Sequence, residues 1–483
     1  MNLNRRTFIG ASSAFMIAGC KTALTYAAND KIKIGVVGVG RISTSMEMRG
    51  VFKCFDKAII TAVCDLDKRR QIFGKKKIEA EYALNHGLVD FEVATYDDYI
   101  EMIRTADIDA VMVCVPDFWH ALVASEAIRA GKAVWMQKPF TQTIHEGRII
   151  ANLAKKYNTV LQVGSQQRSW SQFEAVVRSV REGKLGDIKK VEIGLGIDVA
   201  GGCSKAEPVP STFDYDTWLG PTDHNVPYNW TRCHQQDLSK IENRPGWIQL
   251  APYGWGMITN WGAHHIDIAN WALSTGGRIG PEAVAGTCEW LDLSGDKLWN
   301  VHTSYDLHFT YGKTDVHVCD KYQNGIKFIN EKGDWMFCTR GKMKVTASDP
   351  EPIAVPGELP RLAVSAGLQL PTERQDLIAT KENQAGDIHV KNWIDAIVAR
   401  NPRLTRTNAE LGHRSTSVCS LGQMVMELSR GRKDGASFKW CTKTESTGNA
   451  AIDKMMTPFA NGKFDLKVGL KADGFDYEEM IKA

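Results

Sequence analysis

The run from Asn260 to Asp267, NWGAHHID, combines residue types that can move protons and hold polar ligands. Asn260, His264 and Asp267 are spaced i, i+4 and i+7, so a helix through this run would place all three on one face. Imidazole changes its protonation state close to neutral pH, which makes His264 a candidate general base. The alternative is a histidine that only packs or caps, which is the commoner role of an isolated histidine.

A second candidate, Lys138, follows a short apolar run, Ala133 to Met136, that predicts a buried strand. Ligands of open α/β sheets bind at the carboxyl ends of the strands, and Lys138 would lie at such an end. The alternative is a solvated lysine at the end of a strand.

The stretch from Lys31 to Ser43, KIKIGVVGVGRIS, predicts a nucleotide-binding turn. Its apolar first half is typical of a strand buried on both faces of a parallel sheet. Gly38 and Gly40 then permit a tight turn in which backbone N–H groups approach a pyrophosphate. A second strand, Ala58 to Cys64, leads to Asp65, whose carboxylate would accept hydrogen bonds from the adenosine ribose. A glycine turn that binds no phosphate is the alternative.

The elements that must position these residues change character along the chain. Strands and helices alternate from about residue 31 to 163, which predicts a parallel sheet in a Rossmann dinucleotide-binding domain. Strict apolar alternation follows, as in Val191 to Val199 and Val301 to Phe309, and indicates strands with one exposed face. We therefore expect an α/β chain whose second domain, residues 164–440, is α+β with a large, mostly antiparallel sheet. Residues 441–483 are expected to be a C-terminal extension, and the long aperiodic loop 200–250 to be functional.

Composition excludes some classes of function. The 483 residues carry a formal net charge of +3, with 43% hydrophobic and 24% charged residues. These values are ordinary for a globular protein, and we expect no nucleic-acid partner. The cysteines lack the spacing of a metal site, so no metal is expected, and a disulfide such as Cys203 with Cys233 stays open.

Residues 1–30 are expected to be an export signal and a linker. Arg5 and Arg6 resemble a twin-arginine motif, and Cys20 ends a lipoprotein-type cleavage box. We accordingly expect a periplasmic or cell-envelope protein, exported by the twin-arginine route and held at the membrane only by a lipid on Cys20. An ordinary N-terminus with chance arginines is the alternative.

Together these motifs resemble the glucose-fructose oxidoreductase, inositol dehydrogenase and rhizopine-catabolism (Gfo/Idh/MocA) family of NAD(P)-dependent sugar oxidoreductases, in particular exported bacterial members. The matching pieces are the Gly38–Gly40 turn, Asp65, Pro116 with His120, Gly131-Lys132, Lys138-Pro139 and Gly262 through Asp267. The resemblance implies cofactor contacts at Gly38, Gly40, Arg41, Ile42, Asp65, Pro116, His120 and Lys138. NAD is expected before NADP because Asp65 would repel a 2′-phosphate, although Lys68, Arg69 and Arg70 lie close to it in the sequence.

The resemblance also implies catalytic roles. It assigns the general base to His264 and the contact with the reacting hydroxyl to Lys138. Gln137 stands where the family usually has glutamate, and Asn260 where it usually has aspartate. Because an amide can orient an imidazole without stabilising its charged form, we expect His264 to be a weaker base than in relatives with the acid.

Substrate contacts are expected from aromatic faces and from amide, guanidinium or carboxylate groups, which suit a sugar ring and its hydroxyls. The candidates are Gln166, Arg168, Tyr228, Trp230, Trp255, Asn260 and Asp267. For several of them packing in the core is an equal alternative.

The expected function is an NAD(P)-dependent oxidoreductase that acts on a secondary hydroxyl of a sugar or glycoside. Its cofactor should be held tightly, because a periplasmic enzyme cannot draw on a pool of free NAD. A redox-neutral NAD-dependent glycoside hydrolase that acts through a transient keto-sugar is a second hypothesis, and a catalytically inactive sugar-binding lipoprotein is a third. The resemblance further implies a homo-oligomer.

Overall fold

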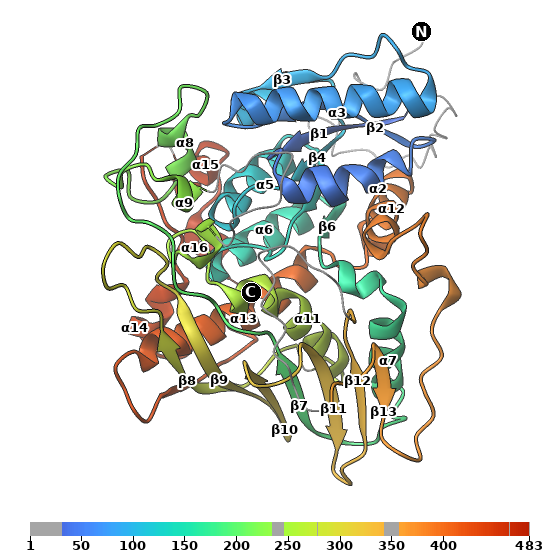
Figure 1. The fold of residues 1–483 in the computed structure, drawn as a ribbon, viewed down its shortest axis with the longest axis vertical. Helices are drawn as coiled ribbons and strands as arrows, with labels where there is room; N and C mark the ends of the chain where they lie inside the picture. Colours follow the sequence, from blue (N-terminus) through green and yellow to red (C-terminus); the bar gives the residue numbers. More distant parts are fainter. Residues whose placement is uncertain (1–30, 234–245, 278, 342–356, 463, 483) are drawn as a thin grey trace.

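The computed structural model describes residues 31–233, 246–277, 279–341, 357–462 and 464–482. The predicted export signal and Cys20 lie outside the described residues. Two sheets organise the described chain: a parallel sheet with its helices at the top of Figure 1 and a second sheet at the bottom. None of the helices in these ranges is long and apolar enough to span a bilayer.

The first sheet has six parallel strands in the order β3-β2-β1-β4-β5-β6, which confirms the predicted Rossmann topology. Its strands are β1 (Ile32–Val37), β2 (Ala58–Cys64), β3 (Ala94–Tyr96), β4 (Ala110–Val113), β5 (Ala133–Met136) and β6 (Leu161–Val163). Its helices are α2 (Met48–Phe52), α3 (Lys68–His86), α4 (Tyr99–Thr105), α5 (His120–Arg129) and α6 (Ile144–Lys156), with a π-helical turn at Ser43–Glu47 and a 3-10 turn at Asp117–Trp119.

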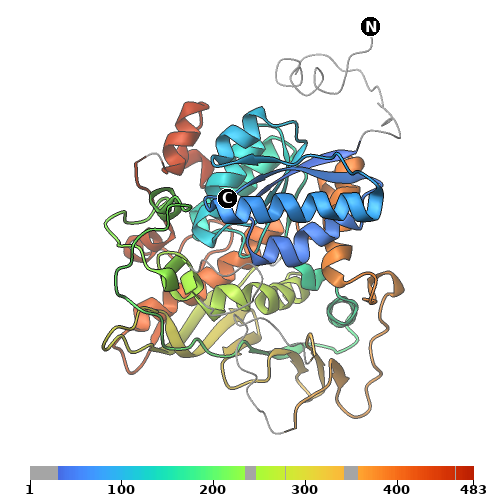
Figure 2. The same ribbon diagram turned by 45° about the horizontal axis from the view of Figure 1, so that its top comes forward.

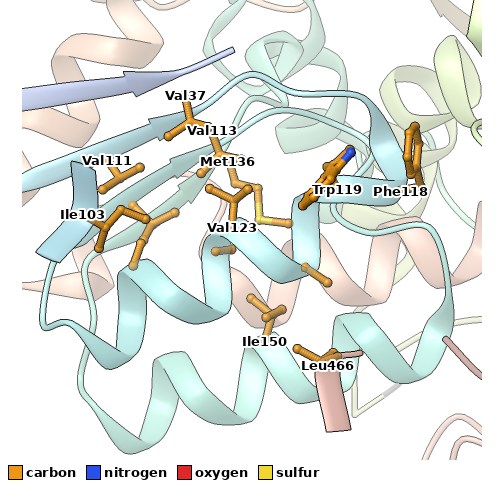
Figure 3. Close-up of a cluster of buried hydrophobic side chains, with 14 of the residues drawn as sticks. Val37, Ile103, Val111, Val113, Phe118, Trp119, Val123, Met136, Ile150 and Leu466 are labelled. Atoms are coloured by element: carbon orange, nitrogen blue, oxygen red, sulfur yellow. The ribbon is translucent and has the colours of Figure 1, made fainter. Parts of the chain in front are cut away.

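Figure 3 shows how one face of this sheet is buried. Val111, Val113 and Met136 project from the strands onto Ile103 of α4 and Val123 of α5. The C-terminal extension joins the same cluster through the apolar side of α15 (Leu466–Ala472), and α16 (Tyr477–Met480) lies against α6. Residues distant in sequence therefore complete the core that supports the strand ends.

The other face of the parallel sheet is covered by a helix from the second half of the chain. Helix α12 (Ala385–Val398) lies beside α2 in Figure 1. Its Val390, Trp393 and Ile394 belong to the same buried cluster as Ile34 and Val36 of β1, and the ring of Trp393 lies 5.8 Å from that of Trp135 on β5. The two halves of the chain therefore share a core.

The second sheet has eight strands in the order β13-β12-β11-β7-β10-β9-β8-β14. Among the described strands of this second sheet, β7 and β10 are the one parallel pair. The sheet is therefore mixed and mostly antiparallel, as predicted. The strands are β7 (Ile188–Gly194), β8 (Ala283–Trp290), β9 (His302–Tyr311), β10 (Thr314–Cys319), β11 (Gly325–Asn330), β12 (Trp335–Cys338), β13 (Leu362–Val364) and β14 (Ala436–Lys439).

The expected strand from Val191 to Val199 ends early, at Gly194. Its neighbour β10 ends opposite Gly194, and β11 begins opposite the same residue, so the backbone beyond it has no ladder to join. The apolar alternation continues past this point, but pairing stops because both partners stop.

The inner face of the second sheet is covered by α7 (Ser171–Arg181), α11 (Gly262–Leu273) and α13 (Ala409–Ser429). Residues on this face, such as Leu307 and Phe309, pack against Ile266 of α11 and Leu421 of α13. These helices separate the second sheet from the parallel sheet, as the turned view in Figure 2 also shows. Helix α11 is preceded by the short helix α10 (Met257–Asn260), and together they form the predicted helical run.

The long loop after β7 returns to the first domain. It contains the short helices α8 (Tyr215–Leu219) and α9 (Trp230–Cys233). Phe213 forms an isolated antiparallel bridge with Asp67, and the Lys68 N–H donates to the carbonyl of Thr212 at 2.9 Å. The remaining short elements are α14 (Ala450–Asp453) and 3-10 turns at Gln166–Ser169, Gly246–Gln249, Gln375–Leu377, Pro402–Leu404 and Lys454–Met456.

Candidate functional site

A cavity of about 480 Å³ opens at the carboxyl ends of β1, β2, β4 and β5. This is the position at which open parallel sheets bind their ligands. The structure brings several predicted residues into its lining, namely Gly38, Gly40, Arg41, Ile42, Asp65, Pro116, Lys138 and Asn260. The loop after β7 and the C-terminal extension supply the facing wall through Phe213, Trp218 and Phe464.

The glycine turn packs closely on the end of β4 because Gly38 has no side chain. Its φ is +90°, and a Cβ there would lie 2.4 Å from the carbonyl oxygen of Cys114 at the end of β4. The position therefore requires glycine, and the turn, which lines the cavity through Gly38 and Gly40, is followed directly by a helical segment that starts at Arg41. Unpaired N–H groups at such a helix start favour a pyrophosphate.

Asp65 follows β2 and is half-buried at the edge of the cavity. Its carboxylate accepts hydrogen bonds from the N–H groups of Val39 (2.7 Å) and Asp67 (2.9 Å). Burial raises the pKa of Asp65, and the Arg70 charge and these two hydrogen bonds oppose that rise. The carboxylate is thereby fixed where the ribose of a dinucleotide would lie.

Lys138 connects the two domains across the cavity. Its ammonium donates to the backbone oxygen (2.9 Å) and the side-chain Oδ1 (2.8 Å) of Asn260 at the end of α10. Both residues line the cavity, so a cation from the first domain and an amide from the second meet in its wall.

Asp117 is a cavity-lining carboxyl group that the sequence reasoning missed. Burial raises its pKa to about 8, while the charge of Lys138 acts in the opposite direction. The group can thus hold a proton at neutral pH beside the lysine. Its place directly after Pro116, inside one of the matched motifs, was the available signal.

Gln137 and Gln166 meet at a buried carboxyl group. The Gln137 amide donates to Oε1 of Glu47, and the Gln166 amide donates to the same oxygen at 2.7 Å. Burial is the main cause that raises the pKa of Glu47 to about 8. Gln166, predicted to contact substrate, is therefore engaged by Glu47 and lies outside the cavity lining.

His264 lies on α11, one turn after Asn260, and is buried. Within the described chain no hydrogen-bond partner reaches its Nδ1. Burial lowers the pKa of His264 well below the usual value, and the charges of Arg340 and Lys138 lower it further. The ring does not line the cavity, so its role as the base stays a prediction. His265 bonds to Asn324 Oδ1 at 3.0 Å, in keeping with a structural role.

Arg168 and Asp267, both predicted to contact substrate, are paired with each other instead. The guanidinium donates to the two carboxylate oxygens at 2.8 and 2.7 Å, and the Ser415 hydroxyl donates to the same carboxylate at 2.5 Å. Their side chains are 3% and 0% exposed and lie outside the cavity lining. The ion pair and the Ser415 hydrogen bond therefore connect three elements inside the protein: the 3-10 turn η3 (Gln166–Ser169), α11 and α13.

Four other predicted residues also lie away from the cavity lining. His120 is buried, and its ring nitrogens contact the carbonyl oxygens of Pro139 (2.7 Å) and Val115 (3.1 Å), so it braces the loop that carries Lys138. Tyr228 is buried among aromatic rings of the long loop, the Trp230 N–H donates to Glu207, and Trp255 packs on the core of the second domain.

The cysteines Cys203 and Cys233 are both free thiols, so the disulfide left open by the sequence is not formed. The aromatic residues of the facing wall were signalled only in part. The aperiodic loop drew attention to Trp218, whereas no sequence pattern pointed to Phe464, which packs edge to face on Trp119 at 5.1 Å.

The amino-acid sequence of the chain is similar to those of known oxidoreductases. Residues 32–165 match the Gfo/Idh/MocA family, described as "Oxidoreductase family, NAD-binding Rossmann fold". A myo-inositol 2-dehydrogenase of Thermotoga maritima is 26% identical over 184 residues, 38% of this chain and 48% of the relative. A glycosyl hydrolase family 109 protein of Saccharopolyspora erythraea is 28% identical over 167 residues, 34% of this chain and 35% of the relative. The matches thus span less than half of these curated relatives.

The whole described fold has counterparts among solved structures. The WlbA dehydrogenase of Bordetella pertussis, in complex with NADH and UDP-GlcNAcA, superposes with a TM-score of 0.56. The superposition covers 85% of this chain and 99% of that one at 14% sequence identity, which shows a common fold. Residues 32–165 thus form a Rossmann domain that matches the NAD-binding family model of the Gfo/Idh/MocA oxidoreductases.

Proposed function

We propose that this protein is an NAD-dependent oxidoreductase that acts on a secondary hydroxyl of a sugar or glycoside. The observation that carries the proposal is the meeting of Lys138 and Asn260 in the wall of the dinucleotide cavity. A cation held there by an amide can exchange that partner for a substrate oxygen. The names of relatives, an inositol dehydrogenase among them, support a polyhydroxylated substrate.

A dinucleotide suits this cavity because the glycine turn and the start of the following helix line it, and because Asp65 stands beside them at the end of β2. When bound, the nicotinamide supplies the site that accepts or gives hydride. Gly38, Gly40 and Arg41 would hold the pyrophosphate, and Asp65 the ribose hydroxyls.

The residues of the chain then divide the remaining work. The Lys138 ammonium binds the substrate oxygen and stabilises the negative charge that develops on it during oxidation. Asn260 orients the ammonium through its two oxygen atoms. His264 is the proposed acceptor of the hydroxyl proton: burial and two nearby cations lower its pKa, so the imidazole is neutral and able to accept at neutral pH.

NAD is favoured over NADP because the basic residues after β2 already have acidic partners. Lys68 pairs with Asp97, Arg69 Nη2 lies 2.7 Å from an Asp67 oxygen, and Arg70 Nε lies 4.0 Å from Asp67. A 2′-phosphate would have to compete with these carboxylates and approach Asp65. The proposal therefore includes NAD as the bound nucleotide.

Tight retention of the nucleotide is supported by the wall that faces the glycine turn. The long loop is tied to the first domain by the Asp67–Phe213 bridge and by a hydrogen bond from the Asp214 N–H to the Leu66 carbonyl at 3.0 Å. Because these backbone ties lie beside the cavity, they hold the loop against the place of the dinucleotide and would slow its release.

A second candidate is the redox-neutral glycoside hydrolase. Asp117, with its pKa raised to about 8, can keep a proton at neutral pH for a leaving group, as elimination of a glycosidic oxygen requires. A relative named as a glycosyl hydrolase family 109 protein is 28% identical to this chain over 167 residues. Net NADH formation with a keto-sugar distinguishes the first candidate, and glycosidic cleavage without net NADH distinguishes the second.

The deciding experiment begins with mass spectrometry of the nucleotide released on denaturing purified protein. The protein is then assayed against a panel of sugars and aryl glycosides, with wild type beside Lys138→Met. We expect bound NAD in both proteins and turnover reduced at least 100-fold in the variant. Lys132→Met, at the opposite end of β5, is the matched control and should keep full turnover. No bound nucleotide, or full activity without Lys138, would contradict the proposal.

Export, lipidation and oligomerisation belong to the same proposal. Cys20→Ala should move the protein from the membrane fraction to the soluble envelope fraction, and Arg5→Lys with Arg6→Lys should retain it in the cytoplasm. Light scattering of the purified protein should give a multiple of the chain mass of 53.7 kDa. A cytoplasmic wild-type protein would contradict the export part.

A further inference from the structure

The outer face of the second sheet carries a group of imidazoles and carboxylates on β9 and β10. His308 and His317 are directly opposite each other in the antiparallel ladder. Because side chains alternate along a strand, Asp306 shares the face of His308, and Asp315 shares the face of His317. Their neighbours Leu307 and Val316 are in the core, so these four polar side chains lie on the face turned away from α11 and α13.

The distances show that three of these side chains converge. Asp306 Oδ1 lies 2.7 Å from His317 Nε2 and 3.2 Å from His308 Nε2. All three atoms lie within 4.8 Å of one another. The two imidazole rings are stacked, with centroids 4.2 Å apart, so both rings direct the same edge at one carboxylate oxygen.

The outer nitrogen of each ring is also engaged. Both oxygens of Asp315 lie 3.0 Å from His308 Nδ1, and the Tyr322 hydroxyl lies 2.7 Å from His317 Nδ1. Tyr322 is itself held by the Lys190 ammonium at 3.0 Å. Carboxylate and hydroxyl partners on the outer nitrogen are what orients a histidine whose other nitrogen binds a metal ion.

The protons of His308 create a conflict that a cation would resolve. An ionised carboxylate only accepts, so the contact with Asp315 places a proton on Nδ1. A neutral imidazole has a single N–H, and its Nε2 lone pair then faces the lone pairs of Asp306 at 3.2 Å. Only a second proton on the ring or a cation between the two groups makes this contact attractive.

We propose that Asp306, His308 and His317 form a binding site for a divalent transition metal ion of the zinc class. Two imidazole nitrogens and one carboxylate oxygen suit such an ion, with one position left for water or a further ligand. Ligand atoms around a tetrahedral zinc ion lie about 3.3 Å apart. The 3.2 Å contact already has this spacing, and the 2.7 Å contact needs to open by about 0.6 Å.

The site is independent of the proposed oxidoreductase activity. It lies across the sheet from α11, the helix that carries His264, and none of its ligands lines the dinucleotide cavity. Asp306 and His308 are about half-exposed and His317 is largely buried, so an ion can enter from solvent and still be held on a rigid ladder. The ion would join β9 to β10 and stabilise the sheet.

Calorimetric titration of the chelator-treated full chain with zinc chloride tests the proposal. We expect one site per chain, with affinity reduced at least tenfold in His308→Asn and His317→Asn, since asparagine keeps a donor but lacks Nε2. His224→Asn is the matched control: His224 also pairs with a carboxylate, Asp216 at 2.8 Å, but has no second imidazole beside it. Its affinity for zinc should equal that of wild type.

Cobalt chloride gives a second reading on the wild-type chain, which needs no variant to fold. Intense visible bands at one equivalent indicate a four-coordinate site, and Asp306→Asn should weaken them. Thermal melting should rise with zinc in wild type and in His224→Asn only. Absence of stoichiometric zinc binding, binding that persists in both ligand variants, or an equal loss in His224→Asn would overturn the proposal.

Discussion

The pairing of Arg168 with Asp267 predicts that Asp267→Asn destabilises the protein far more than an ordinary charge change. The substitution keeps the size of the side chain but leaves the buried guanidinium, 3% exposed, without a counter-charge. Two charge-assisted hydrogen bonds of 2.8 and 2.7 Å are lost or weakened. Breaking one partner of a buried ion pair costs about 3–5 kcal/mol, whereas exposed pairs contribute about 0–1 kcal/mol.

Thermal melting and urea denaturation of the purified variant measure this cost. Asp376→Asn is the matched control, because Asp376 pairs with Arg374 at the surface, where the side chains are 58% and 48% exposed. The free energy of unfolding of this control should lie within about 1 kcal/mol of the wild-type value. The double variant Arg168→Met with Asp267→Leu removes both charges and should recover most of the lost stability. Wild-type melting of Asp267→Asn together with a raised KM would refute the reasoning and restore Asp267 as a substrate ligand.

Three further outcomes follow from the site. The acid limb of kcat/KM should fall only below pH 6.5, because the active base is neutral His264 and its pKa is lowered; a limb at or above pH 6.5 would exclude it. Gly38→Ala should purify with at least tenfold less nucleotide, since its Cβ meets the Cys114 carbonyl; Gly87→Ala, with the same positive φ in open space, should keep it. Phe464→Ala should release nucleotide faster in a dilution assay. An unchanged release rate would show that Phe464 does not hold the nucleotide in the cavity.

The sequence predicted elements whose pattern is local. The buried run of β1 and the alternation of β9 follow from the different faces that these strands bury, and both strands form where expected. The capping box of α6, Thr143 with Glu146, is local in the same sense, because it joins residues three positions apart. The alternation of strands and helices along the chain then predicted the Rossmann topology, because parallel strands joined by helices admit few arrangements.

Partnerships across the chain could not be predicted in the same way. The apolar stripe of α12 shows that the helix is buried, but the stripe does not say that it packs beside α2 and against Trp135 of β5. Arg168 and Asp267 were each chosen for chemistry that suits a sugar, and that same chemistry makes them suit each other. A residue type predicts which partners it can accept, whereas the fold decides whether one of them is already supplied by the protein.

The two departures from the family pattern show how the fold can redistribute charge. Gln137 lacks a carboxylate, yet its amide meets the carboxyl group of Glu47, which the π-helical turn after the glycine turn brings to the same place. Asn260 supplies a neutral oxygen to Lys138, where an aspartate would add a counter-charge. The lysine therefore keeps its full charge for a substrate oxygen, while the imidazole one turn later loses an anionic partner. In the proposed reaction Asn260 would thus weaken His264 as a base, while Lys138 would keep its charge for the substrate oxygen, so we expect the lysine to contribute more than the imidazole.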